Sequence, residues 1–435
     1  MTSPIYRLAV TDQPIESEGK VAFIGRDIRS KPAEIARYCL ASHRGIMEDV
    51  ATIAESIALS DRLFPRHRGT VWTREIQLQI PVFELSTFEN PQVRASLNDA
   101  IHFLTGDKWS IRFVKRSGRP LTQQLLPFEA VKFKYVTPYS DGLDSFAQTR
   151  LLENEAGEEA ILKLRSAKIG QDSEKLQRPV LRVPRHLGSM HKPEQTYRSR
   201  PFVFFSFAGI GAFVSDAEAV VIGETGQGAL GPAMIRYADE WPFRSTHPGF
   251  VSRFSRYLSL VFGKEIAFRL PQLWRTKGEV LRRLADEGLS QGWDETKSCS
   301  VRPNNRHGAP VCGICGGCLL RSLAISSSQI AHPGPAAAFS LTAPEQKAIS
   351  GKAMTLAERH MVVRSLGTMG EFARLAVSQR GQFLIDAESM LFNEADANGI
   401  AGNLRDLINR HASEWQSFAA RFPDGGWAHE IVEQL

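Results

Sequence analysis

Cysteine is scarce in this chain, with 5 residues in 435, and long apolar runs are lacking altogether. No run approaches the roughly 20 apolar residues that a membrane-spanning helix needs, so we expect no membrane partner. The segment from Met1 to Gln13 lacks a basic stretch followed by an apolar run, so we expect no secretory signal and a cytoplasmic location. No repeat of about 20–50 residues and no low-complexity tract is evident, which argues against solenoid architectures.

Excess charge of one sign is also small. The chain has 53 Lys and Arg against 47 Asp and Glu, a formal net charge of +6. This mild balance suits phosphate-bearing ligands and does not by itself imply nucleic acid. The hydrophobic content of 43% and the charged content of 23% are ordinary for a globular protein. The length predicts two or three domains.

Four of the five cysteines cluster in the sequence with the spacing C-x12-C-x2-C-x2-C. They are Cys299, Cys312, Cys315 and Cys318. Four thiolates at this spacing match a closed tetrahedral Zn²⁺ site, so we expect a structural metal. With only Cys39 remaining, a disulfide network is a poor interpretation, and a reducing compartment would keep the thiols available. Reduced surface thiols, a redox pair at Cys312 and Cys315, and His307 as a substitute ligand are the alternatives.

A second pattern is the hexapeptide Ser140-Asp141-Gly142-Leu143-Asp144-Ser145. It follows a β-prone run, Val131 to Val136, and precedes Phe146 to Asn154, which has the pattern of a helix start. A strand, a tight glycine-containing loop and a helix N-terminus together form an anion cradle. Ser140 and Ser145 would donate to phosphate oxygens, and Asp144 would orient the loop or hold Mg²⁺. The alternative is an ordinary strand–turn–helix in which the aspartate serves as a cap.

The order Ser-x-Gly-x-Asp-Ser resembles the PP-loop, Ser-Gly-Gly-x-Asp-Ser, of ATP pyrophosphatases. These enzymes split ATP between its α and β phosphates and leave an adenylated substrate. Together with the downstream cysteines, the loop resembles 7-cyano-7-deazaguanine synthase, a queuosine-pathway family. The likeness covers roughly residues 125–330 and includes Arg200 before Phe202–Phe213, the strand Ala219–Gly223, the element Thr276-Lys277-Gly278-Glu279, and Arg321. The flanks look more like longer synthase-like proteins of bacterial anti-phage operons.

Asp141 departs from the family's pattern, which has glycine there. A carboxylate beside a triphosphate costs Coulomb energy unless it points away or holds a cation. Asp141 therefore indicates a second Mg²⁺ ligand, a different mode of binding, or a dead nucleotide site. We favour intact chemistry, because the other positions of the motif remain.

The resemblance implies an α/β fold with a parallel, Rossmann-like sheet of the adenine nucleotide α-hydrolase type over residues 125–330, including a zinc knuckle at 299–318. Strand signals agree with this and lie near residues 131–137, 160–165, 180–184, 219–223 and 265–269. The run Phe202–Phe205 has strand propensity, yet the resemblance places a helix there, which we favour because propensity is a weak prior.

The flanks are expected to form further domains. Residues 1–124 predict an α/β domain with strands through Ile76–Val82 and Trp109–Phe113 and a helix through Val93–Leu104 between them. An earlier helix is expected near Pro32, with Ile35 and Tyr38 on its inner face. Residues 335–435 predict a helical region after a Pro- and Ala-rich linker at 331–338. A cap at Thr342–Glu345, a helix with Leu384, Ile385, Met390 and Leu391, and another with Leu404, Leu407 and Ile408 are expected there.

By resemblance, the function is ATP-dependent adenylation of a 7-carboxy-7-deazaguanine-type carboxylate, with AMP and pyrophosphate as products. Amide formation with ammonia or a protein N-terminus would follow. The expected cofactors are ATP, Mg²⁺ and Zn²⁺, and the long flanks favour a partner protein from the same operon. The catalytic candidates are Asp144, Ser145 and Lys277. The nucleotide-binding candidates are Ser140, Asp141, Gly142, Leu143, Asp144, Ser145, Arg200, Glu224 and Gly226.

Several assignments compete with plainer ones. Glu224 follows a strand end, where ligands bind in open α/β sheets, but a flexible glycine-rich loop explains it equally well. Lys277 would neutralise phosphate charge, or be a solvated lysine at a helix start. His247 would touch substrate, although an isolated histidine is more often a structural hydrogen-bonder. Three other functions stay open: the plain biosynthetic synthase, a PP-loop tRNA or nucleobase thiolase, and a non-catalytic nucleotide-binding subunit of a defence complex.

Overall fold

The computed structural model describes residues 4–67, 71–120, 129–169, 180–236, 240–299, 311–330, 344, 355–392 and 396–433. The chain divides into two compact units. The first contains Met1–Tyr139, Glu153–Ile222 and Ala238–Arg269, and the second contains Ser140–Leu152, Gly223–Tyr237 and Leu270–Leu435. These units follow contacts in space rather than sequence order, and the division at residues 124 and 335 stays a prediction.

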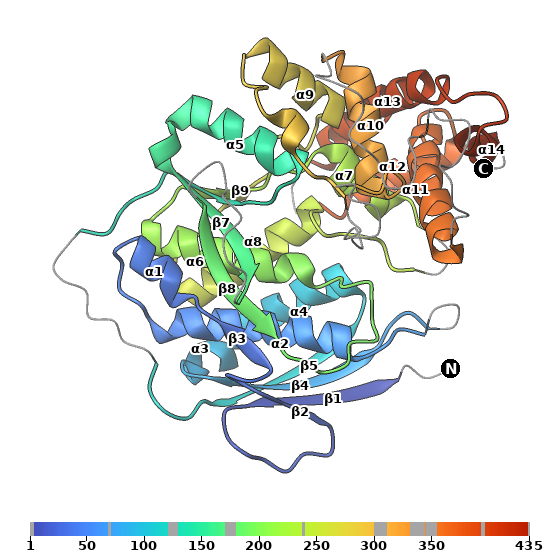
Figure 1. Ribbon diagram of the computed structural model, residues 1–435. Helices are drawn as coiled ribbons and strands as arrows, with labels where there is room; N and C mark the ends of the chain where they lie inside the picture. The colour runs from blue at the N-terminus through green and yellow to red at the C-terminus, as the bar shows by residue number, and fades with distance from the viewer. Residues whose placement is uncertain are drawn as a thin grey trace. The chain divides into compact units, whose positions relative to one another are not determined.

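The first unit contains a four-stranded parallel sheet with the order β2-β1-β4-β5 (Figure 1). Its strands are β1 (Ile5–Thr11), β2 (Lys20–Phe23), β4 (Glu75–Val82) and β5 (Lys108–Lys115). Helix α4 (Pro91–Thr105) connects β4 to β5 after the short helix α3 (Leu85–Glu89). The predicted strand–helix–strand pattern is therefore confirmed.

The same unit contains a six-stranded sheet with the order β10-β9-β6-β7-β8-β3. The strands are β6 (Tyr135–Pro138), β7 (Ile161–Lys168), β8 (Leu181–Leu187), β9 (Ala219–Val221), β10 (Phe268–Arg269) and β3 (Ile28–Ser30). All neighbours are parallel except β3, which pairs antiparallel with β8. All five predicted strands are present, although the first starts at Tyr135 rather than residue 131 and the last is only Phe268–Arg269. The sixth, β3, comes from the N-terminal flank and is too short to leave a pattern in the sequence.

This strand order contains a switch point at β6. From β6 the chain builds β7 and β8 on one side and then returns to build β9 and β10 on the other. In open α/β sheets, ligands bind outside the carboxyl ends of strands at such a point. The chain leaves β6 into residues 140–145 and leaves β9 into residues 223–228. The strand order therefore makes residues 140–145 and 223–228 candidates for ligand binding.

The helices of the first unit cover its sheets. They are α1 (Ala33–Tyr38), α2 (Gly45–Leu63), α6 (Arg200–Ser215) and α8 (Pro248–Phe262), with a 3₁₀ turn at Glu158–Ala160. Helix α6 confirms the disputed helix prediction. A Cβ at its Gly211 would lie 2.8 Å from Leu164 Cδ1, so glycine lets α6 approach the sheet closely. The inward position predicted for Tyr38 is wrong: it is 47% exposed and its ring stacks on Phe133.

The second unit is mainly helical and includes the C-terminal part of the chain (Figure 1, yellow to red). Its helices are α7 (Gly226–Met234), α9 (Lys277–Asp286), α10 (Gly316–Ser328), α11 (Leu356–Arg374), α12 (Gln379–Ser389), α13 (Ala397–Ala419) and α14 (Trp427–Glu433), with a 3₁₀ turn at Trp293–Glu295. Helix α5 (Leu143–Ala156) starts in this unit. The predicted helical C-terminal region is confirmed.

The residues predicted to pack in the C-terminal region agree with the structure in part. Leu404, Leu407 and Ile408 are fully buried on α13, as predicted. Met390 and Leu391 were expected in the same helix as Ile385, but α12 ends at Ser389; Met390 is 78% exposed and does not share the buried face of Ile385. The linker at 331–338 and, apart from Pro344, the expected cap at 342–345 lie outside the described residues. Within the described part of the chain, every helix is too short or too polar to cross a membrane.

Candidate active site and metal centre

The loop at residues 140–145 is closed by its two serines. Ser140 Oγ lies 2.9 Å from Ser145 Oγ, and Ser145 Oγ also accepts a hydrogen bond from Ser140 N at 3.1 Å. Gly142 N donates to Ser140 Oγ at 3.3 Å. The first helical bond of α5 runs from Phe146 N to Gly142 O at 3.0 Å. The N–H groups just before it therefore form the positive N-terminal end of α5, which favours an anion.

The segment that leads to the cysteines holds this loop. Lys297 N donates to Asp141 O at 2.7 Å, and Leu143 N donates to Ser298 Oγ at 3.4 Å. Cys299, the first residue of the cysteine cluster, comes directly after Ser298. A metal that fixes Cys299 would therefore also help to fix the loop, a connection that the separate motifs did not predict.

Lys277 and Asp144 form an ion pair. Lys277 Nζ lies 2.5 Å from Asp144 Oδ2, and the Lys277 residue is only 5% exposed. Lys277 is therefore not a solvated surface lysine. The other carboxylate oxygen, Asp144 Oδ1, is buried and has no hydrogen-bond donor among the described residues. A buried acceptor in that state costs free energy unless a cation or a donor on a ligand reaches it.

Glu224 lies in the electrostatic field of the same pair. Burial, and then the charge of Asp144, raise the pKa of Glu224 to about 8, although Lys277 lowers it. The glycines around Glu224 allow neighbouring groups to lie close to the backbone. A Cβ at Gly228 would lie 2.1 Å from Glu224 Oε1, and one at Gly223 would lie 2.6 Å from Asp144 O. Helix α7 starts at Gly226, so residues 223–225 of this segment lie outside any helix or strand, and the predicted contact of Glu224 with a base stays a prediction. The structure thus brings Asp144, Lys277 and Glu224 together.

Gly226 has a packing environment of its own. A Cβ there would lie 2.2 Å from Leu273 O and 2.4 Å from Leu407 Cδ2. Any larger residue would therefore push α7 away from α13. The structure shows a reason for glycine at this position that does not involve a nucleotide, and the predicted nucleotide contact stays a prediction.

Three other predicted residues have different surroundings. Arg200 starts α6 in the first unit, with its guanidinium 5.1 Å from the centre of the Phe204 ring, and its predicted contact with a nucleotide stays a prediction. His247 is fully buried and caps α8, where Nδ1 accepts from Gly249 N at 2.9 Å, which is a structural role. Arg321 donates to the carbonyl of Thr296 at 2.7 Å and so supports the turn before Cys299.

The four cysteines form a compact cluster. Their sulfur atoms all lie within 4.8 Å of one another, with Cys312 Sγ 3.9 Å from Cys318 Sγ and Cys315 Sγ 4.0 Å from Cys299 Sγ. A Zn–S bond of about 2.3 Å in a tetrahedron sets sulfur atoms about 3.8 Å apart, so the cluster fits a zinc ion. Hydrogen bonds among the crowded thiols raise the pKa of Cys312 and Cys318, and a cation would relieve this crowding. His307 lies outside the described residues.

Cys39 is unsuited to sulfur transfer while it is buried in the folded protein. It is fully buried in the first unit, and burial raises its pKa to about 12. A thiol must ionise to act as a nucleophile, so Cys39 lacks the exposure and acidity of a reactive cysteine. This finding weakens the thiolase alternative.

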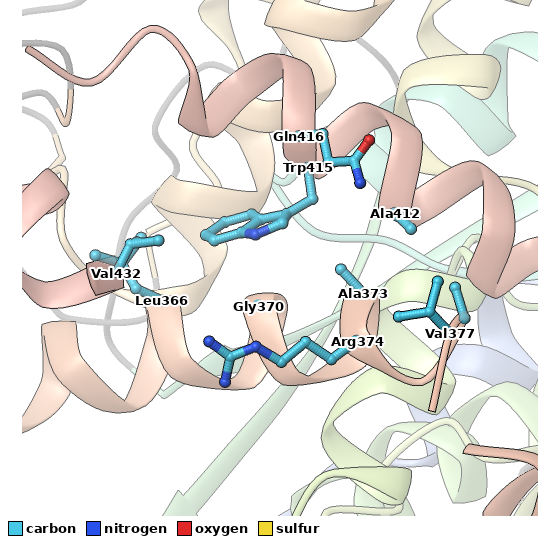
Figure 2. Close-up of a pocket in the computed structure, with 10 residues that line it drawn as sticks. Leu366, Gly370, Ala373, Arg374, Val377, Ala412, Trp415, Gln416 and Val432 are labelled. Atoms are coloured by element: carbon cyan, nitrogen blue, oxygen red, sulfur yellow. The ribbon is translucent and has the colours of Figure 1, made fainter. Parts of the chain in front are cut away.

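A cavity of about 150 Å³ lies among the helices of the second unit (Figure 2). Its walls come from α11, α13 and α14, and include Leu366, Gly370, Trp415 and Val432. No residue of the segments 140–145, 223–228 or 276–279 lines it. The cavity is therefore separate from the residues that carry the chemistry.

Four polar residues around the ion pair were not predicted. They form a hydrogen-bonded group that contacts the backbone N–H of Lys277, and they are Gln227, Thr276, His411 and Glu414. Gln227 and Thr276 stand in segments that the sequence did single out. His411 and Glu414 lie far away in the C-terminal flank, in a helix whose pattern is an ordinary amphipathic one, so nothing in the sequence marked them.

Comparisons with known proteins match the part of the chain that contains the loop at 140–145, Lys277 and the cysteine cluster. Residues 122–329 match the family model described as queuosine biosynthesis protein QueC. The chain is also similar to a 7-cyano-7-deazaguanine synthase from Desulfitobacterium hafniense (strain DSM 10664 / DCB-2), at 27% identity over 159 residues, which are 35% of this chain. The aligned part spans 60% of that relative's length. These matches support a QueC-like PP-loop region and leave both flanks outside it.

Proposed function

We propose that this chain uses ATP to adenylate the carboxylate of a 7-carboxy-7-deazaguanine-type substrate and then joins that carboxylate to an amine. One observation carries the proposal. The ion pair of Lys277 with Asp144 stands at the start of α5, in a loop with the PP-loop order and in a region similar to QueC. Positive charge and an unused carboxylate oxygen thus meet where a nucleotide phosphate would lie.

In the first step, a substrate carboxylate oxygen attacks the α phosphorus of ATP. The bond from that phosphorus to the bridging oxygen breaks, and pyrophosphate leaves with the electron pair. Lys277, the serine hydroxyls and the N–H groups at the start of α5 stabilise the charge that grows on the leaving group. Asp144 Oδ1 and Asp141 would hold Mg²⁺, which supplies further neutralisation of the phosphate oxygens.

In the second step, an amine attacks the carbonyl carbon of the acyl adenylate. An amide forms and AMP leaves, because a phosphate is a far better leaving group than the original carboxylate oxygen. Glu224, after β9, would contact the deazaguanine base, and a carboxyl oxygen of Glu224 would accept from its exocyclic amine. The four cysteines would hold Zn²⁺ as a structural ion close to the loop.

The acceptor amine is ammonia or the N-terminus of a protein. Residues 1–121 and 330–435 lie outside the match to the family model and provide surface beyond the matched region. A protein acceptor would need docking surface, typically about 800 Å² on each partner. We therefore propose a partner protein as the acceptor, with antiviral defence as the setting.

The test is to measure AMP, ADP and pyrophosphate from ATP, Mg²⁺ and 7-carboxy-7-deazaguanine. We expect AMP and pyrophosphate, with turnover lowered about 10²–10³-fold in Lys277→Met and Asp144→Asn. The matched control is Lys264→Met, because Lys264 pairs with Asp216 at the exposed surface. Formation of ADP and phosphate, or normal turnover in Lys277→Met, would contradict the proposal.

A further inference from the structure

Helix α13 presents four side chains to the segments around Lys277. They are Leu407, Arg410, His411 and Glu414, with the spacing i, i+3, i+4 and i+7 that places residues on one face of a helix. All four lie beyond residue 329, where the match to the family model ends. The same helix turns Trp415 and Gln416 toward the separate cavity, so its faces have different environments (Figure 2).

Glu414 binds the two segments that flank the ion pair. Its Oε1 accepts from Thr276 Oγ1 at 2.5 Å, and its Oε2 accepts from Gln227 Nε2 at 2.9 Å. Thr276 is the N-cap of α9, and its side chain also accepts from Glu279 N at 3.1 Å. One carboxylate therefore links the start of α9, where Lys277 stands, to the start of α7.

His411 fixes the orientation of Gln227. Its Nδ1 lies 2.9 Å from Gln227 Nε2, and its Nε2 lies 2.9 Å from Met369 O. This network assigns the proton to Nε2, so that Nδ1 accepts from Gln227. Because the two N–H bonds of Gln227 go to His411 and Glu414, its Oε1 is directed at Lys277 N, 2.8 Å away.

Arg410 and Leu407 complete the contact. Arg410 donates to Trp274 O at 2.7 Å and lies 2.8 Å from Glu279 Oε1. Leu407 packs against Gly226, where no Cβ would fit. Helix α13 thus holds both ends of residues 274–279 and the first turn of α7, while Lys277 Nζ contacts Asp144.

We propose that α13 is a positioning element of the active site: His411 and Glu414 act through Gln227 and Thr276 to hold Lys277 against Asp144. This inference rests on the proposed function for its effect on turnover. It gives the C-terminal flank a role in the chemistry itself, in addition to any docking of a partner. A displacement of about 1 Å in a catalytic group can lower a rate about 10²-fold, so loss of the contact should act on kcat.

The experiment uses the full chain and the variants Glu414→Ala, Glu414→Gln and His411→Phe. We expect kcat for AMP formation to fall about 10–100-fold in Glu414→Ala and His411→Phe, with KM for ATP changed less than about twofold. Glu414→Gln keeps one acceptor oxygen for Gln227 and should recover an intermediate kcat. Ser417→Ala is the matched control, because Ser417 is exposed on the same helix and, within the described part of the chain, donates to Ser413 O of its own helix.

A second readout does not depend on activity. Lys277 is 5% exposed and paired, so acetic anhydride should modify it slowly in the wild type, as measured by mass spectrometry. We expect Glu414→Ala and His411→Phe to be modified at Lys277 about tenfold faster, with Lys264 as the internal reference. If the wild type forms no AMP, the proposed function fails while this labelling still decides the role of α13. Folded His411→Phe with unchanged kcat and unchanged Lys277 labelling would overturn the inference, even if Glu414→Ala does not fold.

Discussion

Replacing Cys315 by serine removes one of four sulfur ligands from a site that is part of the core of the second unit. Cys312, Cys315 and Cys318 are each 5% exposed or less, and they pack with Leu319, Leu366 and Trp415 in one apolar cluster. Cys315 is also the N-cap of α10. A serine there would weaken the metal site and bury a hydroxyl among apolar side chains.

The size of the effect follows from the metal. Structural Zn²⁺ sites contribute about 10–16 kcal/mol, so an equal share for each of four ligands is about 3 kcal/mol. For a cooperative unit of roughly 150–250 residues, each kcal/mol shifts Tm by about 2–4 °C, which predicts a drop of about 10 °C. Because Lys297 and Ser298 hold the loop at 140–145, turnover should fall as well.

The assay combines metal analysis with thermal unfolding, both on protein prepared without chelator. The wild type should carry about one Zn per chain, and Cys315→Ser should carry less and unfold earlier. Cys39→Ala is the matched control, because Cys39 is equally buried but belongs to the other unit. It should keep its zinc. Wild-type protein without zinc, or Cys315→Ser with full zinc content and an unchanged Tm, would refute the reasoning.

Three further predictions follow from particular contacts. Burial lowers the pKa of His411 to about 4. The free energy of unfolding should therefore fall by up to about 3 kcal/mol as the pH drops from about 6.5 to 4, because the unfolded chain binds the proton more tightly. Urea unfolding of His411→Gln should show a shallower pH dependence. Gly226→Ala should lower both Tm and turnover, because its Cβ would lie 2.2 Å from Leu273 O. Gly402→Ala, with open space around its Cβ in the interior of α13, should lower neither, since alanine is favoured over glycine in a helix. If the acceptor is a partner protein, as proposed above, incubation with ATP, 7-carboxy-7-deazaguanine and that protein should add covalent mass to it. Efficient formation of free nitrile from ammonia alone, by the full chain, would favour the plain synthase.

The sequence predicted those parts of the molecule that carry a local pattern. Strands β4 and β5 alternate polar and apolar residues, which is the pattern of a half-buried strand. The spacing of the four cysteines predicted that their sulfur atoms would lie close together, as they do. Helix α6 is instructive, because its first turns have strand propensity and only the resemblance favoured a helix. Its place against β6 and β7 explains the outcome, since packing outweighs propensity.

The remainder could not be predicted because it depends on contacts between distant segments. Strand β3 has three residues and pairs with β8, more than 150 positions away. From the sequence, a solvated Lys277 is nearly as good an interpretation as a phosphate-binding one; its burial and its contact with Asp144 decide against the solvated lysine. Gln227, His411 and Glu414 form no motif, because their positions are set by the packing of α13 on α7 and α9.

The central claim is that a carboxylate oxygen attacks the α phosphorus of ATP. The most direct measurement uses 7-carboxy-7-deazaguanine labelled with ¹⁸O in its carboxylate, incubated with the full chain, ATP, Mg²⁺ and an amine source. After amide formation, mass spectrometry should find one ¹⁸O in the phosphate of AMP, and pyrophosphate without label. Unlabelled AMP would show that water attacked the nucleotide, and ADP with phosphate would show cleavage at another bond. Either result would contradict carboxylate adenylation at this site.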